Sequence, residues 1–190
     1  MRNKLPRHSF KESKFRYVVP NFFTAASLIS GLIALEFISR GLNGEKNGFV
    51  TAAWLIVVSM FFDGLDGKIA RMLNAVSKFG SEIDSLSDFA VFGIVPAFLA
   101  YKSVLYEFGY LGIGVSIFYV LAGVFRLARF NTKIGDKKKK NFFEGLPIPA
   151  AAAAVSATVI FNFHNWGEIH KKNTFLVIVL ISAVLMVSKI

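Results

Sequence analysis

The sequence predicts an all-α protein with about six transmembrane helices. Hydrophobic residues make up 54% of the 190 residues, and charged residues only 18%. A soluble domain of this length has too little interior to bury so much apolar surface, so a lipid bilayer is the expected solvent. Several stretches are also mostly apolar over about 20 residues, the length that crosses a membrane. We expect a single membrane domain over residues 1–190.

The apolar stretches define the expected spans in chain order. The first begins at Pro20-Asn21, a pair that is common at helix starts. The second span ends in acidic and basic residues, and the third begins with acidic residues before becoming apolar. We therefore expect polar groups of both spans to lie at the same membrane depth. The expected spans are residues 20–38, 48–71, 79–101, 109–130, 146–164 and 173–189.

Residues 1–19 form the segment before the first span, and residues 20–190 form the membrane region. Residues 9–19 mix aromatic and basic side chains, which predicts a short interfacial helix lying on the membrane surface. A disordered basic tail is the alternative. Because no small-residue cleavage site follows the first apolar stretch, we expect an anchor rather than a removed signal peptide.

Basic residues indicate the orientation of the chain. The formal net charge is +10, and most of the 22 Lys and Arg residues lie on the side of the membrane that holds the N-terminus. Because basic segments stay in the cytoplasm, we expect both termini and the acidic segment at the cytoplasmic face of the cell membrane. Such charge faces anionic lipid in a membrane protein. The bilayer, and not nucleic acid, is the expected partner.

Four aspartates lie close together in the sequence. Asp63 and Asp66 are three residues apart, and Asp84 and Asp88 are four apart, so each pair shares one face of a helix. The two pairs belong to neighbouring spans of opposite direction that are joined by a short loop. We therefore expect all four carboxylates to converge on one small volume.

Such a cluster predicts a metal site. Like charges a few ångströms apart in a poorly hydrated place are unfavourable unless cations are bound. Oxygen ligands favour Mg²⁺, Mn²⁺ or Ca²⁺ over zinc, and the absence of Cys excludes thiolate ligands and disulfides. Magnesium usually bridges carboxylates and substrate phosphates, which favours a phosphate-bearing substrate and up to two metals. Neutralisation by Lys68, Arg71 and Lys78, or a proton- or ion-coupled transporter, is the alternative.

Small residues accompany the acidic face. Gly67 and Gly80 carry no side chain and Ala70 carries only a methyl group, which leaves room for a flat group such as a nucleotide against the backbone. Arg71 is suited to pairing with a phosphate.

The same stretch resembles the signature of the CDP-alcohol phosphotransferase family, D-x-x-D-G-x-x-A-R, eight residues, then G-x-x-x-D-x-x-x-D. Every fixed position is filled here, and residues 72–79 form the spacer. The resemblance implies a homodimeric enzyme that transfers a phosphatidyl or related group from a CDP-linked lipid to an alcohol and releases CMP. The matching residues are Asp63, Asp66, Gly67, Ala70, Arg71, Gly80, Asp84 and Asp88.

The resemblance also implies roles for individual residues. The four aspartates would bind two divalent cations, Mg²⁺ or Mn²⁺, and Asp88 would also remove the proton of the acceptor hydroxyl. A carboxylate beside the reacting phosphorus can reach the attacking oxygen, which agrees with that role. Helix capping is the alternative role of Asn21 and Thr24. The residues implied in nucleotide and donor binding are Asn21, Thr24, Gly67, Ala70, Arg71, Ser77 and Gly80.

The second half of the chain is expected to select the acceptor. Arg126 and Arg129 lie three residues apart at the end of the fourth span and are expected to face the acidic cleft. Residues 126–131 and 144–149 resemble segments of bacterial and archaeal phosphatidylserine synthases. This resemblance implies L-serine as acceptor and CDP-diacylglycerol or a CDP-archaeol-like lipid as donor. An Arg together with Glu144 suits the zwitterionic amino acid.

Two alternatives stay open for these segments. Paired arginines suit a phosphorylated acceptor equally well, so glycerol phosphate and inositol phosphate are other possible alcohols. Alternatively, Arg126 and Arg129 are ordinary basic residues at the cytoplasmic end of a helix. The prolines in residues 144–149 would then only mark the start of the next helix.

Overall fold

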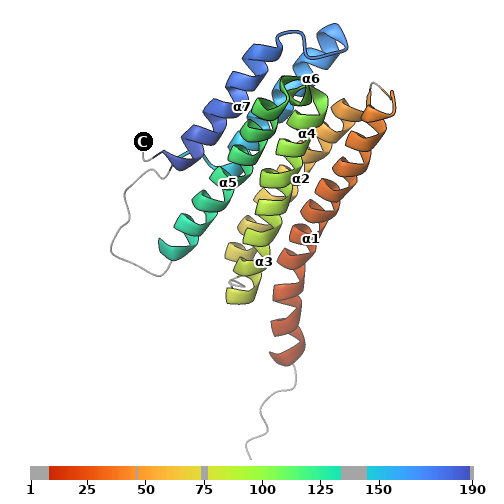
Figure 1. Ribbon diagram of the computed structural model, residues 1–190. Coiled ribbons are helices and arrows are strands. Elements are labelled where there is room, and N and C mark those ends of the chain that lie inside the picture. Colours follow the sequence, from red (N-terminus) through yellow and green to blue (C-terminus); the bar gives the residue numbers. More distant parts are fainter. Residues whose placement is uncertain (1–8, 46, 74–76, 134–144, 189–190) are drawn as a thin grey trace, which may run out of the picture.

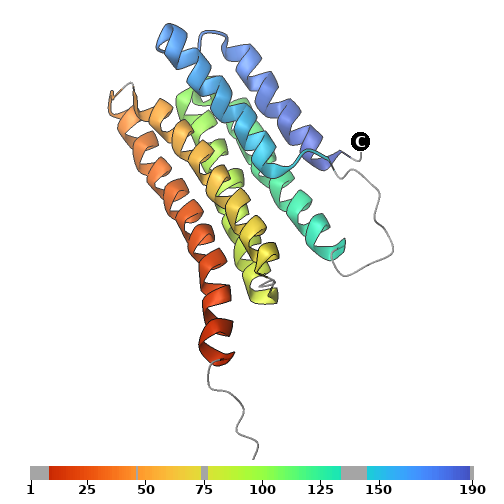
Figure 2. The same cartoon turned by 180° about the vertical axis from the view of Figure 1, so that it is seen from behind.

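The structure is a bundle of long helices that run side by side (Figures 1 and 2). The computed structural model describes residues 9–45, 47–73, 77–133 and 145–188, and no strand occurs among them. The fold class predicted from the sequence is therefore confirmed. The elements are α1 (Ser9–Leu42), α2 (Asn47–Met72), α3 (Lys78–Asp88), the π-helix η1 (Phe89–Ile94), α4 (Val95–Ser103), the 3₁₀-helix η2 (Leu105–Phe108), α5 (Tyr110–Lys133), α6 (Ile148–Trp166) and α7 (Lys172–Val187).

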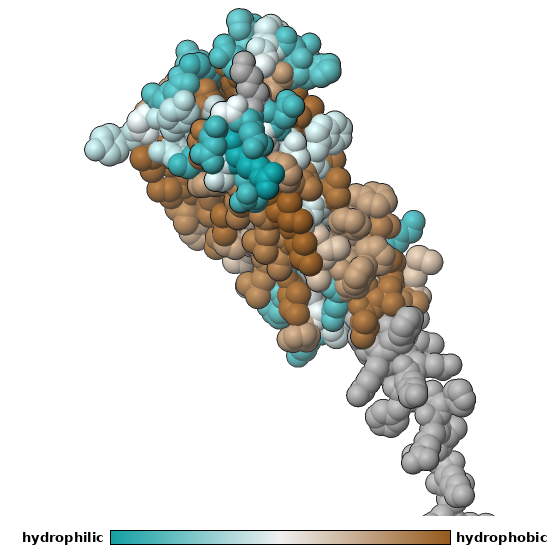
Figure 3. Space-filling view, turned by 90° about the vertical axis from the view of Figure 1, so that its right-hand side faces the viewer, coloured by the Kyte–Doolittle hydropathy of each residue, from teal (hydrophilic) through white to brown (hydrophobic). Residues whose placement is uncertain are grey.

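Four helical segments are long and apolar enough to cross a membrane, which makes a polytopic membrane protein. In Figure 3, hydrophobic residues cover the flank of the bundle and hydrophilic residues gather toward its upper end. The helix α7 is apolar but has only 16 residues, so the expected count of six spans stays a prediction for the last two helices. The four segments are Val18–Leu42, Asn47–Met72, Lys78–Ser103 and Tyr110–Thr132.

The N-terminal part of α1 differs from the expectation. Residues 9–19 are helical, as predicted, but they continue into the first span without a break, so the predicted helix start at Pro20 is wrong. The interfacial position of residues 9–19 stays a prediction. Proline fixes a φ angle that helices already use, but inside a helix it removes one backbone hydrogen bond and its ring crowds the carbonyl four residues earlier. Pro20 is nevertheless an interior residue of α1 and not its start.

The contact between α1 and α2 is unusually close at Gly48. A Cβ atom on this residue would lie 2.4 Å from the backbone nitrogen of Gly41 and 2.5 Å from the carbonyl oxygen of Phe37. Further along, Ser27 and Ser59 each donate a hydrogen bond to the other's backbone carbonyl at 3.1 Å. Small and hydroxyl-bearing residues at such contacts are typical of helices that pack inside membranes. They fix α1 against α2 along much of their length.

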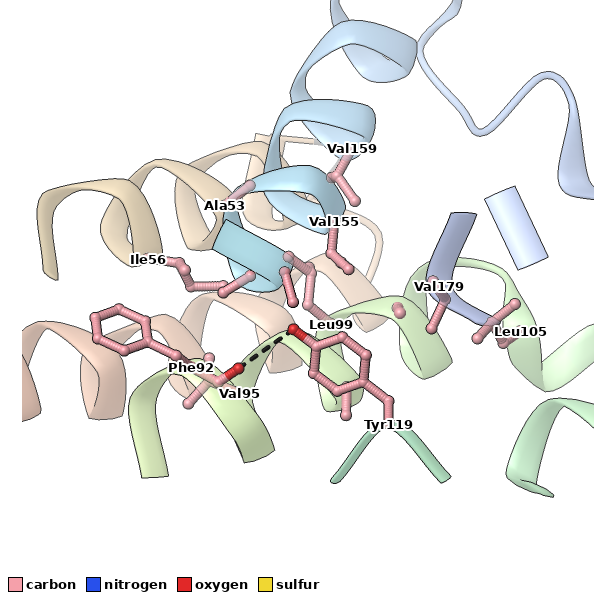
Figure 4. Packing of buried hydrophobic residues seen from close by; sticks show 14 of the residues in the cluster. Ala53, Ile56, Phe92, Val95, Leu99, Leu105, Tyr119, Val155, Val159 and Val179 are labelled. Carbon is pink, nitrogen blue, oxygen red and sulfur yellow. Dashed lines mark hydrogen bonds between the residues drawn. The ribbon is translucent and has the colours of Figure 1, made fainter. Parts of the chain in front are cut away.

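The remaining helices pack around a mainly apolar centre, in which Ser156 of α6 and Ser182 of α7 are buried polar residues. Figure 4 shows side chains of α2, η1, α4, α6 and α7 meeting around the buried Tyr119 of α5. Ala151 and Ala152 of α6 are also completely buried, so the alanine-rich start of this helix is a packing surface. The centre of the bundle is therefore mainly apolar, and the four aspartates of α2 and α3 lie towards one end.

Replacing Gly48 with Ala should force α1 and α2 apart. Overpacking of this kind costs about 1–3 kcal/mol, so we expect a lower thermal unfolding midpoint for the purified protein in detergent. Gly114→Ala is the matched control, because a Cβ atom there meets no other atom within 4 Å and alanine favours the helix. Equal unfolding midpoints for wild type and Gly48→Ala would contradict the close contact.

Candidate active site

Two helix ends bring three carboxylates together. Asp63 and Asp66 lie near the end of α2, and Asp84 lies on α3, which returns in the opposite direction. One carboxylate oxygen from each of the three lies within 4.8 Å of the others. The spacing in the sequence therefore indicated the correct faces of both helices. This group is called the acidic cluster below.

Asp88 is the last residue of α3 and lies beside the acidic cluster. Its carboxyl group interacts with the side chain of Asp63. The Oδ1 oxygen of Asp88 is buried and has no hydrogen-bond partner among the residues that the structure describes. A buried carboxylate oxygen without a donor is unfavourable unless a ligand or cation supplies the missing contact.

Asp66 is the most buried member of the cluster, with 4% of its surface exposed. Thr24 Oγ1 donates a hydrogen bond to its Oδ2 at 2.6 Å. This short bond joins α1 to the cluster and fixes the direction of the carboxylate. Sequence reasoning placed Thr24 among the donor-binding residues but missed its bond to Asp66, for which a separation of 42 residues gives no local signal.

A cavity of about 170 Å³ opens next to the cluster. All seven residues that the family resemblance assigned to donor binding line it, together with Asp66 and Asp84. The remaining lining residues are Pro20 and Ser81. The seven are Asn21, Thr24, Gly67, Ala70, Arg71, Ser77 and Gly80.

Several of these residues have clear local reasons for their positions. Asn21 and Thr24 lie inside α1, so helix capping does not explain them. Ser77 is the N-cap of α3 and accepts a hydrogen bond from the Gly80 backbone at 3.0 Å. A Cβ atom on Gly80 would lie only 3.0 Å from that hydroxyl oxygen, whereas Gly67 faces open space. The small residues therefore keep the cavity open on the α2 side and allow a tight N-cap on the α3 side.

Two of the predicted acceptor residues, Arg126 and Arg129, are described and do not line this cavity. Arg129 Nη1 donates to the backbone carbonyl of Val187, the last residue of α7, at 3.1 Å. The guanidinium of Arg126 lies 5.8 Å from the ring centre of Phe130. Neither arginine lines the cavity described above, although both were expected to face the acidic cleft. Glu144 lies outside the described residues.

The two segments expected to select the acceptor nevertheless meet at the end of α7. The Leu146 backbone N–H donates to the Leu185 carbonyl at 2.9 Å. Gly145 has φ +74°, and a Cβ atom there would lie 2.6 Å from the same carbonyl oxygen. Arg129 donates to the Val187 carbonyl and Leu146 donates to the Leu185 carbonyl. Both segments therefore bond carbonyl groups that the end of α7 leaves without intrahelical partners. This arrangement was missed because nothing in the sequence links these positions to α7.

One further contact connects the two halves of the protein. Ser85, next to Asp84 on α3, and Asn131, near the end of α5, exchange hydrogen bonds of 3.3 and 3.1 Å between their side chains. The end of α5 is therefore tied to the helix that carries half of the aspartates.

The residues of the acidic cluster fit a divalent-metal site. The ion pairs between described residues join Arg40 to Glu36 and Lys172 to Glu107, and neither involves the cluster. Neutralisation by Lys68, Arg71 or Lys78 therefore finds no support in the geometry. An all-oxygen donor set, together with the partnerless Oδ1 of Asp88, suits Mg²⁺ or Mn²⁺.

The fold and this site define a polytopic helical membrane protein with an acidic, phosphate-compatible centre at one end of the bundle. The sequence profile of the CDP-alcohol phosphatidyltransferase family matches residues 17–188. The chain belongs to this family and is an enzyme, so the transporter alternative has no support. Divalent metals are general in the family, and the acidic cluster is compatible with them.

Curated relatives extend this comparison. A CDP-diacylglycerol–serine O-phosphatidyltransferase of Helicobacter pylori (strain ATCC 700392 / 26695) is 42% identical over 175 residues, covering 92% of this chain and 71% of the relative. The enzyme of that name from Bacillus subtilis (strain 168) is 35% identical, covering 76% of this chain and 75% of the relative. An archaetidylserine synthase of Methanothermobacter thermautotrophicus is 34% identical, covering 77% of this chain and 60% of the relative.

Thr24→Val should weaken metal binding without unfolding the protein. Valine keeps the shape of the side chain but removes the hydrogen bond that orients Asp66. Loss of such a supporting bond typically lowers metal affinity by about tenfold or more. The measurement is a titration of Mn²⁺, followed by electron paramagnetic resonance, without any substrate.

Two variants control this titration. Thr24→Ser keeps the hydroxyl and should bind Mn²⁺ like wild type. Ser27→Ala removes a buried hydroxyl of the same helix that bonds the Ser59 carbonyl instead of the cluster, and it should also leave Mn²⁺ affinity unchanged. A Thr24→Val protein with wild-type affinity would show that this bond does not support the metal ligands.

Proposed function

We propose that this enzyme transfers the phosphatidyl group of a CDP-linked lipid, CDP-diacylglycerol or its archaeol-like counterpart, to the hydroxyl of L-serine and releases CMP. The observation that carries the proposal is the cavity that all seven donor-motif residues line directly beside the acidic cluster. The serine transferases named above support the choice of acceptor. We treat residues 1–190 as one catalytic domain, since the family match spans residues 17–188.

The CDP head of the donor is proposed to occupy the cavity between α1, α2 and α3. Asn21 and Ser77 offer polar atoms to the nucleotide, and the exposed Arg71 offers its guanidinium to the phosphates. Phe22 of α1, next to Asn21, and Phe61 of α2, two residues before Asp63, are 67% and 65% exposed. Apolar side chains beside a polar cavity suit a substrate whose tails remain in the bilayer, so the lipid is proposed to enter sideways.

The chemical step is a displacement at the β-phosphorus, the one bonded to the lipid. The serine hydroxyl oxygen attacks this phosphorus, its proton passes to Asp88, and the phosphorus–oxygen bond to CMP breaks. Asp88 suits this role because its buried Oδ1 has no donor within the described part of the chain and can accept a proton. Two divalent cations, Mg²⁺ or Mn²⁺, would be held by Asp63, Asp66, Asp84 and Asp88 and would supply positive charge to the phosphates.

The acceptor is proposed to reach this centre from the end of the bundle where α5 and α7 end. Arg126, Arg129 and Glu144 are the proposed contacts of serine. Support comes from the Ser85–Asn131 bonds, which connect the end of α5 to the helix of Asp84 and Asp88. A zwitterionic acceptor suits a place that combines guanidinium and carboxylate groups.

The orientation of the chain in the membrane and its oligomeric state are also proposed. Both termini and the acidic cluster are proposed to face the cytoplasm, because basic residues predominate on that side of the chain. A homodimer is proposed from family resemblance alone.

Purified protein in detergent should release CMP from CDP-diacylglycerol when L-serine and Mg²⁺ or Mn²⁺ are supplied. Release should stop with a chelator and fall at least about 100-fold in Asp88→Asn, because general-base contributions are of that size. Glu82→Gln is the control, since Glu82 is an exposed acid of the same helix. Release with glycerol phosphate or inositol phosphate instead of serine would keep the family reaction and reject the acceptor.

Asp66→Ala should behave differently from Asp88→Asn. Asp88→Asn should largely retain binding of the CDP-lipid, whereas Asp66→Ala should weaken binding of both metal and donor because it removes a buried ligand. Equilibrium binding of Mn²⁺ and of a CDP-lipid to each variant distinguishes the two roles. Unchanged metal affinity in Asp66→Ala would contradict its assignment as a ligand.

A further inference from the structure

A wide helical turn separates the acidic half of the third span from its apolar half. The π-helix η1 (Phe89–Ile94) follows Asp88 directly, and the backbone N–H of Val95 donates to the carbonyl of Ala90, five residues earlier. Turns of this kind inside α-helices are rare and frequently occur at functional sites. Its position, immediately after Asp88, links it to the acidic cluster.

Pro96 explains why the helix widens here. In a regular α-helix, the N–H of residue 96 would donate to the carbonyl of Phe92, but proline has no N–H and its ring collides with that carbonyl. A wide turn moves the Phe92 carbonyl away from the ring. It also leaves this buried carbonyl without its usual helical donor.

Tyr119 supplies the missing donor. Its side chain is 0% exposed, and its hydroxyl donates to the Phe92 carbonyl oxygen at 3.3 Å (Figure 4). The surrounding side chains are apolar, including Leu99 and Val155. A phenylalanine would fill the same volume without burying a polar group. The hydroxyl of Tyr119 therefore has a specific use here, which is to donate to the carbonyl for which Pro96 has no N–H.

The wide turn also sets the rotation between the two halves of the span. One residue corresponds to about 100° of rotation in an α-helix. Inserting or removing the extra residue of a π-turn therefore rotates the face of Asp84 and Asp88 by about that angle relative to Val95 and Leu99, which pack in the core. Without the wide turn, the core face and the acidic face could not both keep their observed directions.

We propose that Tyr119 is a positioning residue for the acidic cluster, acting through the Phe92 carbonyl and the π-turn that places Asp84 and Asp88. The proposal rests on the proposed function for its catalytic consequence. Its effect on metal binding does not depend on which alcohol is the acceptor.

Tyr119→Phe tests this proposal. The variant keeps the ring, so we expect a folded protein that elutes like wild type in size-exclusion chromatography. Loss of one buried hydrogen bond corresponds to about a tenfold effect. We expect about tenfold weaker Mn²⁺ binding by electron paramagnetic resonance without substrate, and about tenfold lower kcat with little change in KM for the CDP-lipid. Tyr110→Phe, an exposed position of the same helix, should change neither quantity.

Pro96→Ala supplies a background in which the hydroxyl is no longer needed by the Phe92 carbonyl; because the span can then also return towards a regular helix, this variant should itself bind Mn²⁺ more weakly than wild type, and the double variant is compared with it alone. Alanine restores a backbone N–H that can donate to the Phe92 carbonyl. Adding Tyr119→Phe to Pro96→Ala should therefore leave Mn²⁺ affinity within about twofold of Pro96→Ala alone. A tenfold loss in both backgrounds would overturn the proposal, because the hydroxyl would then act by another route. If Tyr119→Phe alone does not fold, recovery of a folded protein in the double variant would support the proposal, and a tenfold loss of Mn²⁺ affinity relative to Pro96→Ala would still overturn it.

Two further results separate a positioning role of Tyr119 from a packing role, and the positioning role from the proposed function. Wild-type Mn²⁺ affinity and kcat in folded Tyr119→Phe, even with a lower unfolding midpoint, would reduce Tyr119 to a packing residue and overturn the proposal. If wild type releases no CMP with any alcohol, the proposed function fails. The comparison of Mn²⁺ affinities between wild type and Tyr119→Phe still tests the positioning role.

Discussion

Three carboxylates with oxygens within 4.8 Å of one another impose the main constraint on this bundle. Like charges at the end of apolar helices repel, so contacts elsewhere must hold the helices that carry them. The close approach of α1 and α2 at Gly48 and the short bond from Thr24 to Asp66 fix one side of the cluster. The N-cap at Ser77 fixes the start of the opposing helix. The apolar packing therefore serves as a frame for a few polar atoms.

Local patterns allowed much of this arrangement to be predicted. Apolar stretches of membrane-spanning length identified α2, the third span and α5, and the spacing of the aspartates identified the faces that meet. The donor cavity was predictable because most of its lining comes from one continuous stretch, residues 63–84, whose helical directions follow from hydropathy. Asn21 and Thr24 came from resemblance alone, since their distance along the chain from this stretch hides the contact.

Long-range contacts and helix irregularities could not be predicted. Thr24 and Asp66 are 42 residues apart, and Arg129 and Val187 are 58 apart, so neither bond leaves a local pattern. Pro20 suggested a helix start, because proline is favoured in the first turn and disfavoured in the interior, yet α1 continues through it. The π-turn has a local cause in Pro96. Its location nevertheless depends on Tyr119, which a separate helix brings to the Phe92 carbonyl.

The third span has to satisfy two environments in succession. Its first half presents carboxylates to a polar cavity, and its second half packs Val95 and Leu99 into the apolar centre. A regular helix carries one rotational phase along its whole length, so the direction of one face would dictate the direction of the other. A wide turn between the halves removes that dependence, at the expense of a carbonyl that needs an outside donor. Tyr119 provides it from α5, so the apolar core and the acidic cluster are oriented by the same buried hydrogen bond.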